Sequence, residues 1–225
     1  MKKFVLILII GFIGIIGSII FFVFTGLYTD MRLLRAAKDC DVQSVQSFLN
    51  KGANVNFKEK FGNRRTSLHF AAIADNKEVA LLLIEKGADI NINDKDSRTP
   101  LHLAVGNNND QMAMLLIDKG ADVNVTGKDG WTPLHVAVGD NNDQMAMLLI
   151  DKGADANVTD WDGRTPLHTT NNKEVAMLLI DKGSDVNVTD KDGKTPLHNT
   201  INQEVAMLLI DKGADVNVTD MDNRT

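Results

Sequence analysis

The fold is decided by residues 99–131, which read TPLHLAVGNNNDQMAMLLIDKGADVNVTGKDGW. Residues 132–164 repeat this stretch almost unchanged, as TPLHVAVGDNNDQMAMLLIDKGADANVTDWDGR. The Thr that opens each unit recurs at Thr66, Thr99, Thr132, Thr165, Thr195 and Thr225, in steps of 33, 33, 33, 30 and 30 residues. Self-similarity at a fixed period predicts a fold built by stacking one supersecondary unit.

Each unit reads as two helices followed by a turn. Thr99 is a preferred N-cap residue, and Pro100 takes the first helical position, which tolerates proline, so a short helix begins there. After a polar run, a second helix gains one apolar face from the i, i+3, i+4 spacing of Met112, Leu115 and Leu116. Gly120 ends this helix, and the Asp-Gly pair at 129–130 predicts a turn between short extended pieces. One helix pair cannot bury its apolar face alone, so neighbouring pairs must stack into a solenoid.

These units resemble the ankyrin repeat. The resemblance rests on Thr-Pro-Leu-His, the Leu-Leu pair of the second helix and Lys-Gly-Ala-Asp-Val-Asn, which recur in register from about Met31 to the end. It implies an all-α ankyrin-repeat solenoid in which a β-hairpin finger follows each helix-turn-helix, and it implies protein binding without catalysis. We expect one repeat domain over residues 31–225, with repeats at about 31–65, 66–98, 99–131, 132–164, 165–194 and 195–224.

Three repeats depart from the common pattern. Repeat 31–65 lacks Thr-Pro-Leu-His and has a longer finger, FKEKFGNRR, as a terminal capping repeat can. Asp30 is expected to cap its first helix. Repeats 165–194 and 195–224 lack three residues between the His and the second helix, which predicts a shortened first helix in both.

The N-terminal segment Phe4–Phe24 contains 21 residues without a charge. A helix of that length spans about 30 Å, the thickness of a bilayer's hydrocarbon core, so residues 1–28 are predicted to form an uncleaved single-pass transmembrane anchor. A secretory signal is the alternative, with Lys2 and Lys3 as its basic start, but the apolar run is long and no small-x-small cleavage site follows. The positive charges on the two sides of Phe4–Phe24 are nearly equal in number, so they do not indicate the orientation of the anchor in the membrane. The resemblance favours a cytoplasmic repeat domain, and a periplasmic one remains the alternative.

Composition and motifs point away from several function classes. The net charge is -6 and the repeats contain no basic block, which argues against nucleic-acid binding. Cys40 is the single cysteine, so no internal disulfide can form. We find no phosphate-binding loop, no paired acid and base and no nucleophile with a partner, and therefore expect no enzymatic activity.

No metal or other cofactor is expected either. The five His residues, His69, His102, His135, His168 and His198, occupy the same position in successive repeats. That places their rings roughly 8 to 10 Å apart, too far to share one zinc ion, so a hydrogen-bonding role at the helix start is predicted. The Asp-x-Asp-Gly turns lack the other ligands of a calcium loop.

Comparing the repeats with one another indicates candidate partner-binding residues. The finger-tip position carries Lys95, Lys128, Trp161, Lys191 and Met221. Trp is enriched at binding hot spots, and Trp161 has no evident packing role, whereas Trp131 can pack on the next repeat. The predicted partner-binding residues are Trp161, Lys128, Lys191, Lys95, Leu103 and Val136. The alternative is a solvated finger tip that binds nothing.

A second unusual feature is a row of thioethers. Met114, Met147, Met177 and Met207 follow the core-facing position by two residues, so they are expected to point away from the core. Packing between repeats is one explanation, and weak self-association is the other.

The sequence therefore predicts a membrane-tethered protein-protein interaction module that binds an unidentified protein with its finger tips and first-helix surface. Two alternatives remain open. One is a secreted ankyrin-repeat effector released by cleavage of the N-terminal segment, and the other is a structural membrane-surface assembly protein formed through Gly14, Ser18 and the methionine row.

Overall fold

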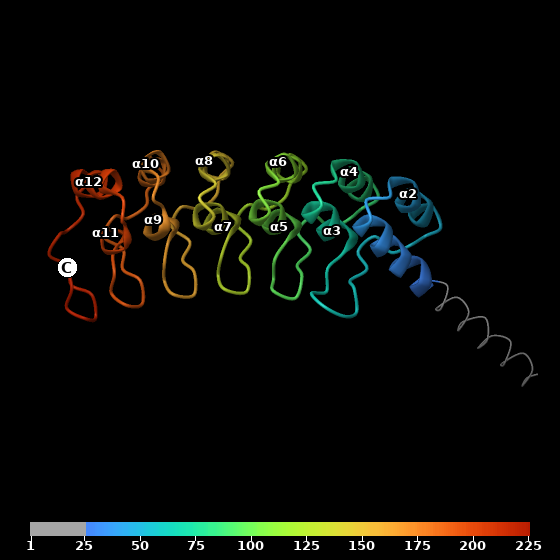
Figure 1. Ribbon diagram of the computed structural model, residues 1–225, viewed down its shortest axis with the longest axis horizontal. Helices are drawn as coiled ribbons and strands as arrows, with labels where there is room; N and C mark the ends of the chain where they lie inside the picture. The colour runs from blue at the N-terminus through green and yellow to red at the C-terminus, as the bar shows by residue number, and fades with distance from the viewer. Residues whose placement is uncertain (1–25) are drawn as a thin grey trace, which may run out of the picture. The chain divides into compact units, whose positions relative to one another are not determined.

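The computed structural model describes residues 26–225 (Figure 1). These residues belong to two compact units, one ending at Asp89 and the other covering Ile90–Thr225. The predicted anchor at Phe4–Phe24 lies outside the described residues, and from residue 26 onward no helix is long and apolar enough to cross a membrane. The unit boundary falls inside predicted repeat 66–98, and a single repeat domain over 31–225 stays a prediction.

The first unit begins with helical residues 26–38, followed by α2 (Val42–Asn50), α3 (Ser67–Ile73) and α4 (Lys77–Glu85). The prediction that Asp30 caps a helix is wrong, because the helix already includes residues 26–29 and Asp30 lies within it. Its carboxylate instead accepts a hydrogen bond from the backbone N–H of Asn54 at 2.6 Å. Asp41 is the residue that caps α2, by accepting the N–H of Ser44 at 3.0 Å.

The second unit is a stack of four helix pairs, with inner and outer helices in separate rows (Figure 1). The inner helices are α5 (Pro100–Gly106), α7 (Pro133–Gly139), α9 (Pro166–Thr169) and α11 (Pro196–Asn199). The outer helices are α6 (Asp110–Asp118), α8 (Asp143–Asp151), α10 (Lys173–Asp181) and α12 (Gln203–Asp211). Since α9 and α11 have four residues each where α5 and α7 have seven, the predicted shortening is confirmed.

The inner helices begin as their Thr-Pro sequences predict. At α5 the side chain of Thr99 accepts the N–H of His102, and the ring Nδ1 of His102 accepts the N–H of Thr99 at 3.2 Å. This reciprocal pair satisfies two of the N–H groups that every helix start leaves without an intrahelical partner. The outer helices end before a glycine in the left-handed region, as at Gly120 with φ of +93°.

The core lies where neighbouring pairs stack. Leu101, Leu134 and Leu149 are completely buried, as are Met112 and Leu116. Burying one such side chain contributes about 2 kcal/mol, and no single pair contains enough of them to fold alone. Stacking, rather than the short helices themselves, therefore stabilises this unit.

The fingers differ from the predicted β-hairpins, because no strand is present among residues 26–225. Each finger of the second unit is a five-residue turn whose first and last residues are joined by one backbone bond, as from the N–H of Asp160 to the carbonyl of Arg164 at 2.9 Å. Single bonds also join adjacent fingers, such as the N–H of Trp161 to the carbonyl of Asp129 at 3.0 Å. One bond on each side is too few for a strand ladder.

Candidate partner-binding site

A buried or half-buried carboxylate closes most of the fingers. In finger 94–98, one oxygen of Asp94 accepts the backbone N–H groups of Asp96 at 2.8 Å and Arg98 at 3.0 Å. The same pair of bonds, at 2.8 to 2.9 Å, is made in fingers 160–164, 190–194 and 220–224 by Asp160, Asp190 and Asp220. We call this side chain the clamp carboxylate. In the longer finger of the first unit its place is taken by Glu59, which accepts from Asn63 and Arg65.

The cation that ends a finger often pairs with the clamp carboxylate. The Arg98 guanidinium lies 3.0 Å from the carboxylate of Asp94 and 3.1 Å from that of Asp96. Burial alone would raise the pKa of Asp94, but the backbone N–H groups and the Arg98 guanidinium outweigh it and hold this pKa below its ordinary value. In the last finger the N–H of Arg224, with its guanidinium, lowers the pKa of Asp220 to about 2. The carboxylates of Asp94 and Asp220 are therefore ionised at neutral pH.

Finger 127–131 departs from this arrangement at two positions. Gly127 stands where the other fingers have Asp or Glu, and Trp131 stands where they end in Arg or Lys. The backbone bonds of the finger are kept, since the N–H of Gly127 donates to the carbonyl of Trp131 at 2.8 Å. Within residues 26–225, the N–H groups of Asp129 and Trp131 have no acceptor.

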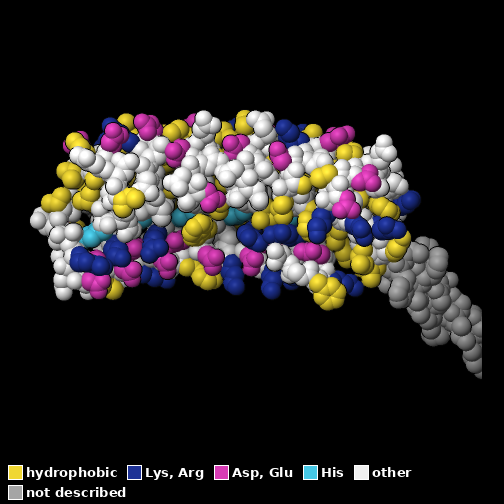
Figure 2. All heavy atoms as spheres, in the orientation of Figure 1, with side chains coloured by type: hydrophobic (Ala, Val, Ile, Leu, Met, Phe, Trp, Pro, Cys, Tyr) yellow, Lys and Arg dark blue, Asp and Glu magenta, His cyan; other side chains and the backbone are white. Residues whose placement is uncertain are grey.

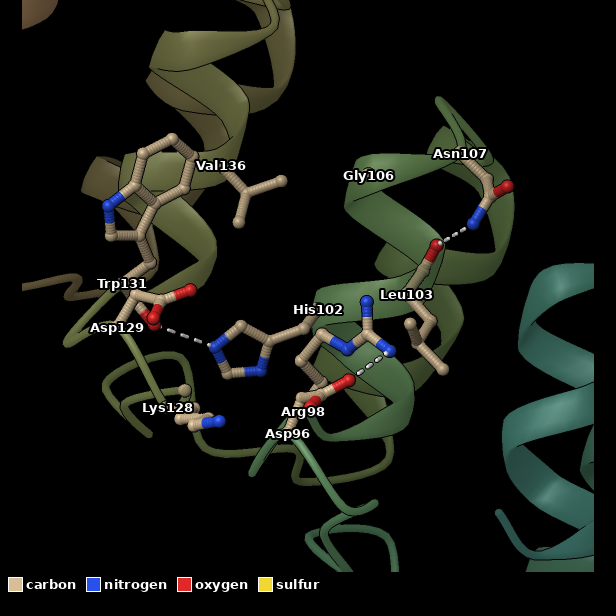
Figure 3. Close-up of a pocket in the computed structure, with 11 residues that line it drawn as sticks. Asp96, Arg98, His102, Leu103, Gly106, Asn107, Lys128, Asp129, Trp131 and Val136 are labelled. Carbon is tan, nitrogen blue, oxygen red and sulfur yellow. Dashed lines mark hydrogen bonds and ion pairs between the residues drawn. The ribbon is translucent and has the colours of Figure 1, made fainter. Parts of the chain in front are cut away.

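A pocket of about 340 Å³ opens beside this finger. Figure 3 shows that its walls come from finger 94–98, helix α5, finger 127–131 and helix α7. Its side chains combine cations with apolar groups, and the principal ones are Arg98, His102, Leu103, Lys128, Trp131 and Val136. Trp131 is 41% exposed, and its ring edge lies 3.5 Å from the position that a Cβ would take on Gly139, near the end of α7. The packing of Trp131 on the next repeat is thus confirmed.

The predicted partner-binding residues fall into two groups. Lys128, Leu103 and Val136 line the pocket together, although Leu103 is only 5% exposed and offers little surface. Lys95, Trp161 and Lys191 are exposed at the tips of separate fingers. Figure 2 shows cationic and acidic side chains side by side along these fingers.

Trp161 has a neighbour that the sequence did not indicate. Its side chain is 58% exposed, yet its ring atom Cδ1 lies 3.0 Å from the position that a Cβ would take on Gly130. Gly130 has φ of +78°, so both its backbone conformation and this close approach require glycine. The ring is therefore held against the preceding finger with much of its surface still open to solvent.

Sequence reasoning missed Arg98, Gly127 and the pocket role of Trp131. The signal was present, because aligning the first finger position of the repeats shows Gly127 among acidic residues. Its meaning depends on the hydrogen bonds that the aspartates make in the other fingers.

The histidines have the structural role that their position predicted. In His135, Nδ1 accepts the N–H of Thr132 at 3.2 Å, and Nε2 lies 3.2 Å from the carbonyl of Arg164. Because a carbonyl only accepts, Nε2 carries the proton and the ring is neutral. Burial lowers the pKa of His102, His135 and His168, in keeping with neutral rings that link the start of each inner helix to the finger that ends the same repeat.

The methionine row points outward as predicted. Met114 is 41% exposed, Met177 39% and Met207 57%, while Met147 is half-buried. Weak self-association through this row stays a prediction. Sedimentation at increasing protein concentration tests it, and a constant sedimentation coefficient would argue against it.

Comparisons with known proteins agree with this architecture. A family profile described as Ankyrin repeats (3 copies) matches residues 33–127, 119–190 and 162–220. The ankyrin repeat domain of Bcl-3, a member of the IkappaB protein family, superimposes with a TM-score of 0.74 at 28% identity, covering 86% of this chain and 91% of that one.

Curated relatives match over shorter stretches. A probable E3 ubiquitin-protein ligase of Oryza sativa subsp. japonica, XBOS32, is 32% identical over 82 residues, which is 36% of this chain and 16% of the relative. The mitochondrial disaggregase of Homo sapiens is 42% identical over 65 residues, which is 29% of this chain and 9% of the relative. The chain thus spans less than a fifth of the length of these two relatives.

Proposed function

Since the chain belongs to the ankyrin-repeat family, we propose that it is a protein-interaction module whose finger tips and inner helices bind a partner protein. The observation that carries this proposal is the exposed aromatic and cationic surface of neighbouring fingers. Trp161 is 58% exposed at the tip of finger 160–164. Lys128 and Trp131 of the preceding finger line a pocket. Tryptophan and cationic side chains around a partly desolvated pocket are typical of binding hot spots.

The proposal extends to the membrane. The uncharged stretch Phe4–Phe24 is long enough to anchor the chain as a single-pass protein, with the repeats on the cytoplasmic side. Tethering would raise the effective concentration of the repeats near the bilayer, so that modest affinity suffices. Protease treatment of intact cells tests this topology: digestion of the repeats from outside would contradict it, and a mature chain that begins after Tyr28 would favour secretion.

Catalysis is not part of the proposal. The two relatives named for enzymatic or disaggregase activity share only a short stretch with this chain. Because this chain covers only 16% and 9% of those relatives, the activity of the whole relatives gives no reason to expect chemistry here.

Site-specific cross-linking tests the proposed binding surface. The full chain is made in its native cells with a photoreactive phenylalanine analogue at Trp161, and separately at Lys182, an exposed residue that follows outer helix α10. The analogue at position 161 should yield a discrete adduct that position 182 does not. The Trp161→Ala variant should then bind the captured protein about tenfold more weakly or worse, as expected for a hot spot. Equal adducts from both positions would refute the assignment.

A further inference from the structure

Finger 127–131 keeps the backbone geometry of its neighbours although it lacks their clamp carboxylate. The N–H of Gly127 donates to the carbonyl of Trp131 at 2.8 Å, and the corresponding bond in finger 160–164 measures 2.9 Å. The glycine at the fourth position has φ of +78° in one finger and +79° in the other. The N–H groups of the third and fifth residues therefore point in the same direction in both fingers, toward the position that a clamp carboxylate would take.

In finger 160–164 that place is occupied. One oxygen of Asp160 accepts the N–H of Asp162 at 2.9 Å and the N–H of Arg164 at 2.8 Å. The corresponding donors in finger 127–131 belong to Asp129 and Trp131, and neither has an acceptor within the described part of the chain. Two converging N–H groups form a site of positive potential that suits one carboxylate oxygen.

The surroundings favour an anion with a short apolar stem. Lys128 and Arg98 both line the pocket beside these donors. The acidic groups nearby are partly neutralised, because Asp94 and Asp96 both pair with Arg98, and the carboxylate of Asp129 is the remaining negative charge on the pocket wall. Leu103, Val136 and the Trp131 ring supply apolar surface for the methylene groups of a side chain (Figure 3).

Space is available because of Gly127. A Cβ built there would lie 3.4 Å from the carbonyl oxygen of Trp131 and 3.7 Å from that of Asp96, so the position is open enough for a side chain. The adjoining pocket holds about 340 Å³.

We propose that finger 127–131 binds the carboxylate of an Asp or Glu side chain from the partner protein, which takes the place of the clamp carboxylate that this finger lacks. The inference rests on the proposed partner-binding function and specifies its chemistry: an acidic side chain caps the N–H groups of Asp129 and Trp131, next to Lys128.

The direct test uses N-acetyl-L-glutamate α-methylamide, whose single carboxylate is that of the side chain, as the probe and amide NMR of the full chain in non-ionic detergent as the readout. The amide protons of Asp129 and Trp131 should move downfield in a saturable way, while those of Asp162 and Arg164 stay in place. N-acetyl-L-glutamine α-methylamide, which has nearly the same shape but no carboxylate, and sodium chloride at equal ionic strength should leave all four unchanged. The proposal is overturned if glutamate and glutamine probes act alike, or if both fingers respond equally.

Two matched variants exchange the features of the two fingers. Gly127→Asp supplies the carboxylate within the chain, so its amide protons at 129 and 131 should already be shifted and should no longer respond to the probe. Asp160→Gly removes the clamp, so the probe response should appear at Asp162 and Arg164. If Asp160→Gly disrupts its finger, Gly127→Asp alone decides, and a retained probe response in that variant contradicts the site.

Cross-linking from position 161 separates this inference from the proposed function. In the Gly127→Asp background, capture of the partner should fall about tenfold or more if the partner's carboxylate occupies the site. Undiminished capture would refute the carboxylate site and leave the interaction surface standing. Probe binding at Asp129 and Trp131 without capture of any partner by the unmodified chain would support the site and contradict the proposed function.

Discussion

Asp94 is predicted to be the residue on which the stability of finger 94–98 depends. Its side chain is fully buried and accepts two backbone N–H groups at 2.8 and 3.0 Å. Hydrogen bonds to a charged group contribute about 1.5 to 3 kcal/mol each, and donors that regain water recover part of this. The Arg98 side chain is 35% exposed, so the ion pair adds no more than about 1 kcal/mol. Asp94→Ala should therefore lower the free energy of unfolding by about 3 kcal/mol.

A matched substitution separates the contribution of the hydrogen bonds to this loss of stability from that of the ion pair. Asp94→Asn keeps an oxygen that can accept both N–H groups but loses the charge beside Arg98, so it should cost about 1.5 kcal/mol. Asp118→Ala is the control, because that carboxylate is 64% exposed and makes one surface ion pair with Lys152. Its cost should stay below about 0.5 kcal/mol.

Urea unfolding followed by circular dichroism at pH 7 measures these differences. Hydrogen exchange at Asp96 and Arg98 shows whether only the finger opens, since repeat stacks can lose structure locally. The reasoning is refuted if Asp94→Ala costs no more than Asp118→Ala, or if Asp94→Asn is as damaging as Asp94→Ala.

The same variants test the pKa of Asp94. Burial would raise this pKa, but the backbone N–H groups and the Arg98 guanidinium outweigh it, so the folded value lies below that of the unfolded chain. A lowered carboxyl pKa stabilises the fold above the unfolded value of about 4, and this contribution is lost as the pH falls through the folded pKa. The difference in the free energy of unfolding between the unmodified chain and Asp94→Ala should therefore become smaller below about pH 4. A gap that is constant down to pH 2 would contradict the lowered pKa.

Two further substitutions address the core and the histidines that join an inner helix to its finger. Leu134→Ala removes a completely buried side chain of α7 and should cost about 3 kcal/mol in urea unfolding, whereas a cost below about 1 kcal/mol would mean that neighbouring pairs do not pack as described. His135→Gln keeps one acceptor and one donor but cannot take up a proton near neutral pH. Because burial lowers the pKa of His135, the unmodified chain should lose stability as the pH falls below about 6.5, and the variant should lose less of it; identical pH profiles would argue against this.

Local signals accounted for much of the fold. Thr99 and Pro100 start helix α5, and Gly120 follows the end of α6. Each of these helix boundaries can be recognised from a few consecutive residues of the sequence. The same holds for the shortening of α9, since three missing residues remove nearly one helical turn. Asp30 shows the limit of such signals, because a good capping residue can also lie inside a helix when the preceding residues are helical.

What the sequence by itself determined is the repeat, its helix boundaries and the positions where one copy differs from another. The membrane anchor at Phe4–Phe24 was inferred from the sequence and stays a prediction. Only the tertiary structure decided what the differences mean. Capping and periodicity act within one or two helical turns, whereas the pocket at Gly127 depends on N–H groups left without a carboxylate and on walls from segments about one repeat apart. Such contacts arise only when the repeats stack, so they cannot be recognised from any one repeat read alone.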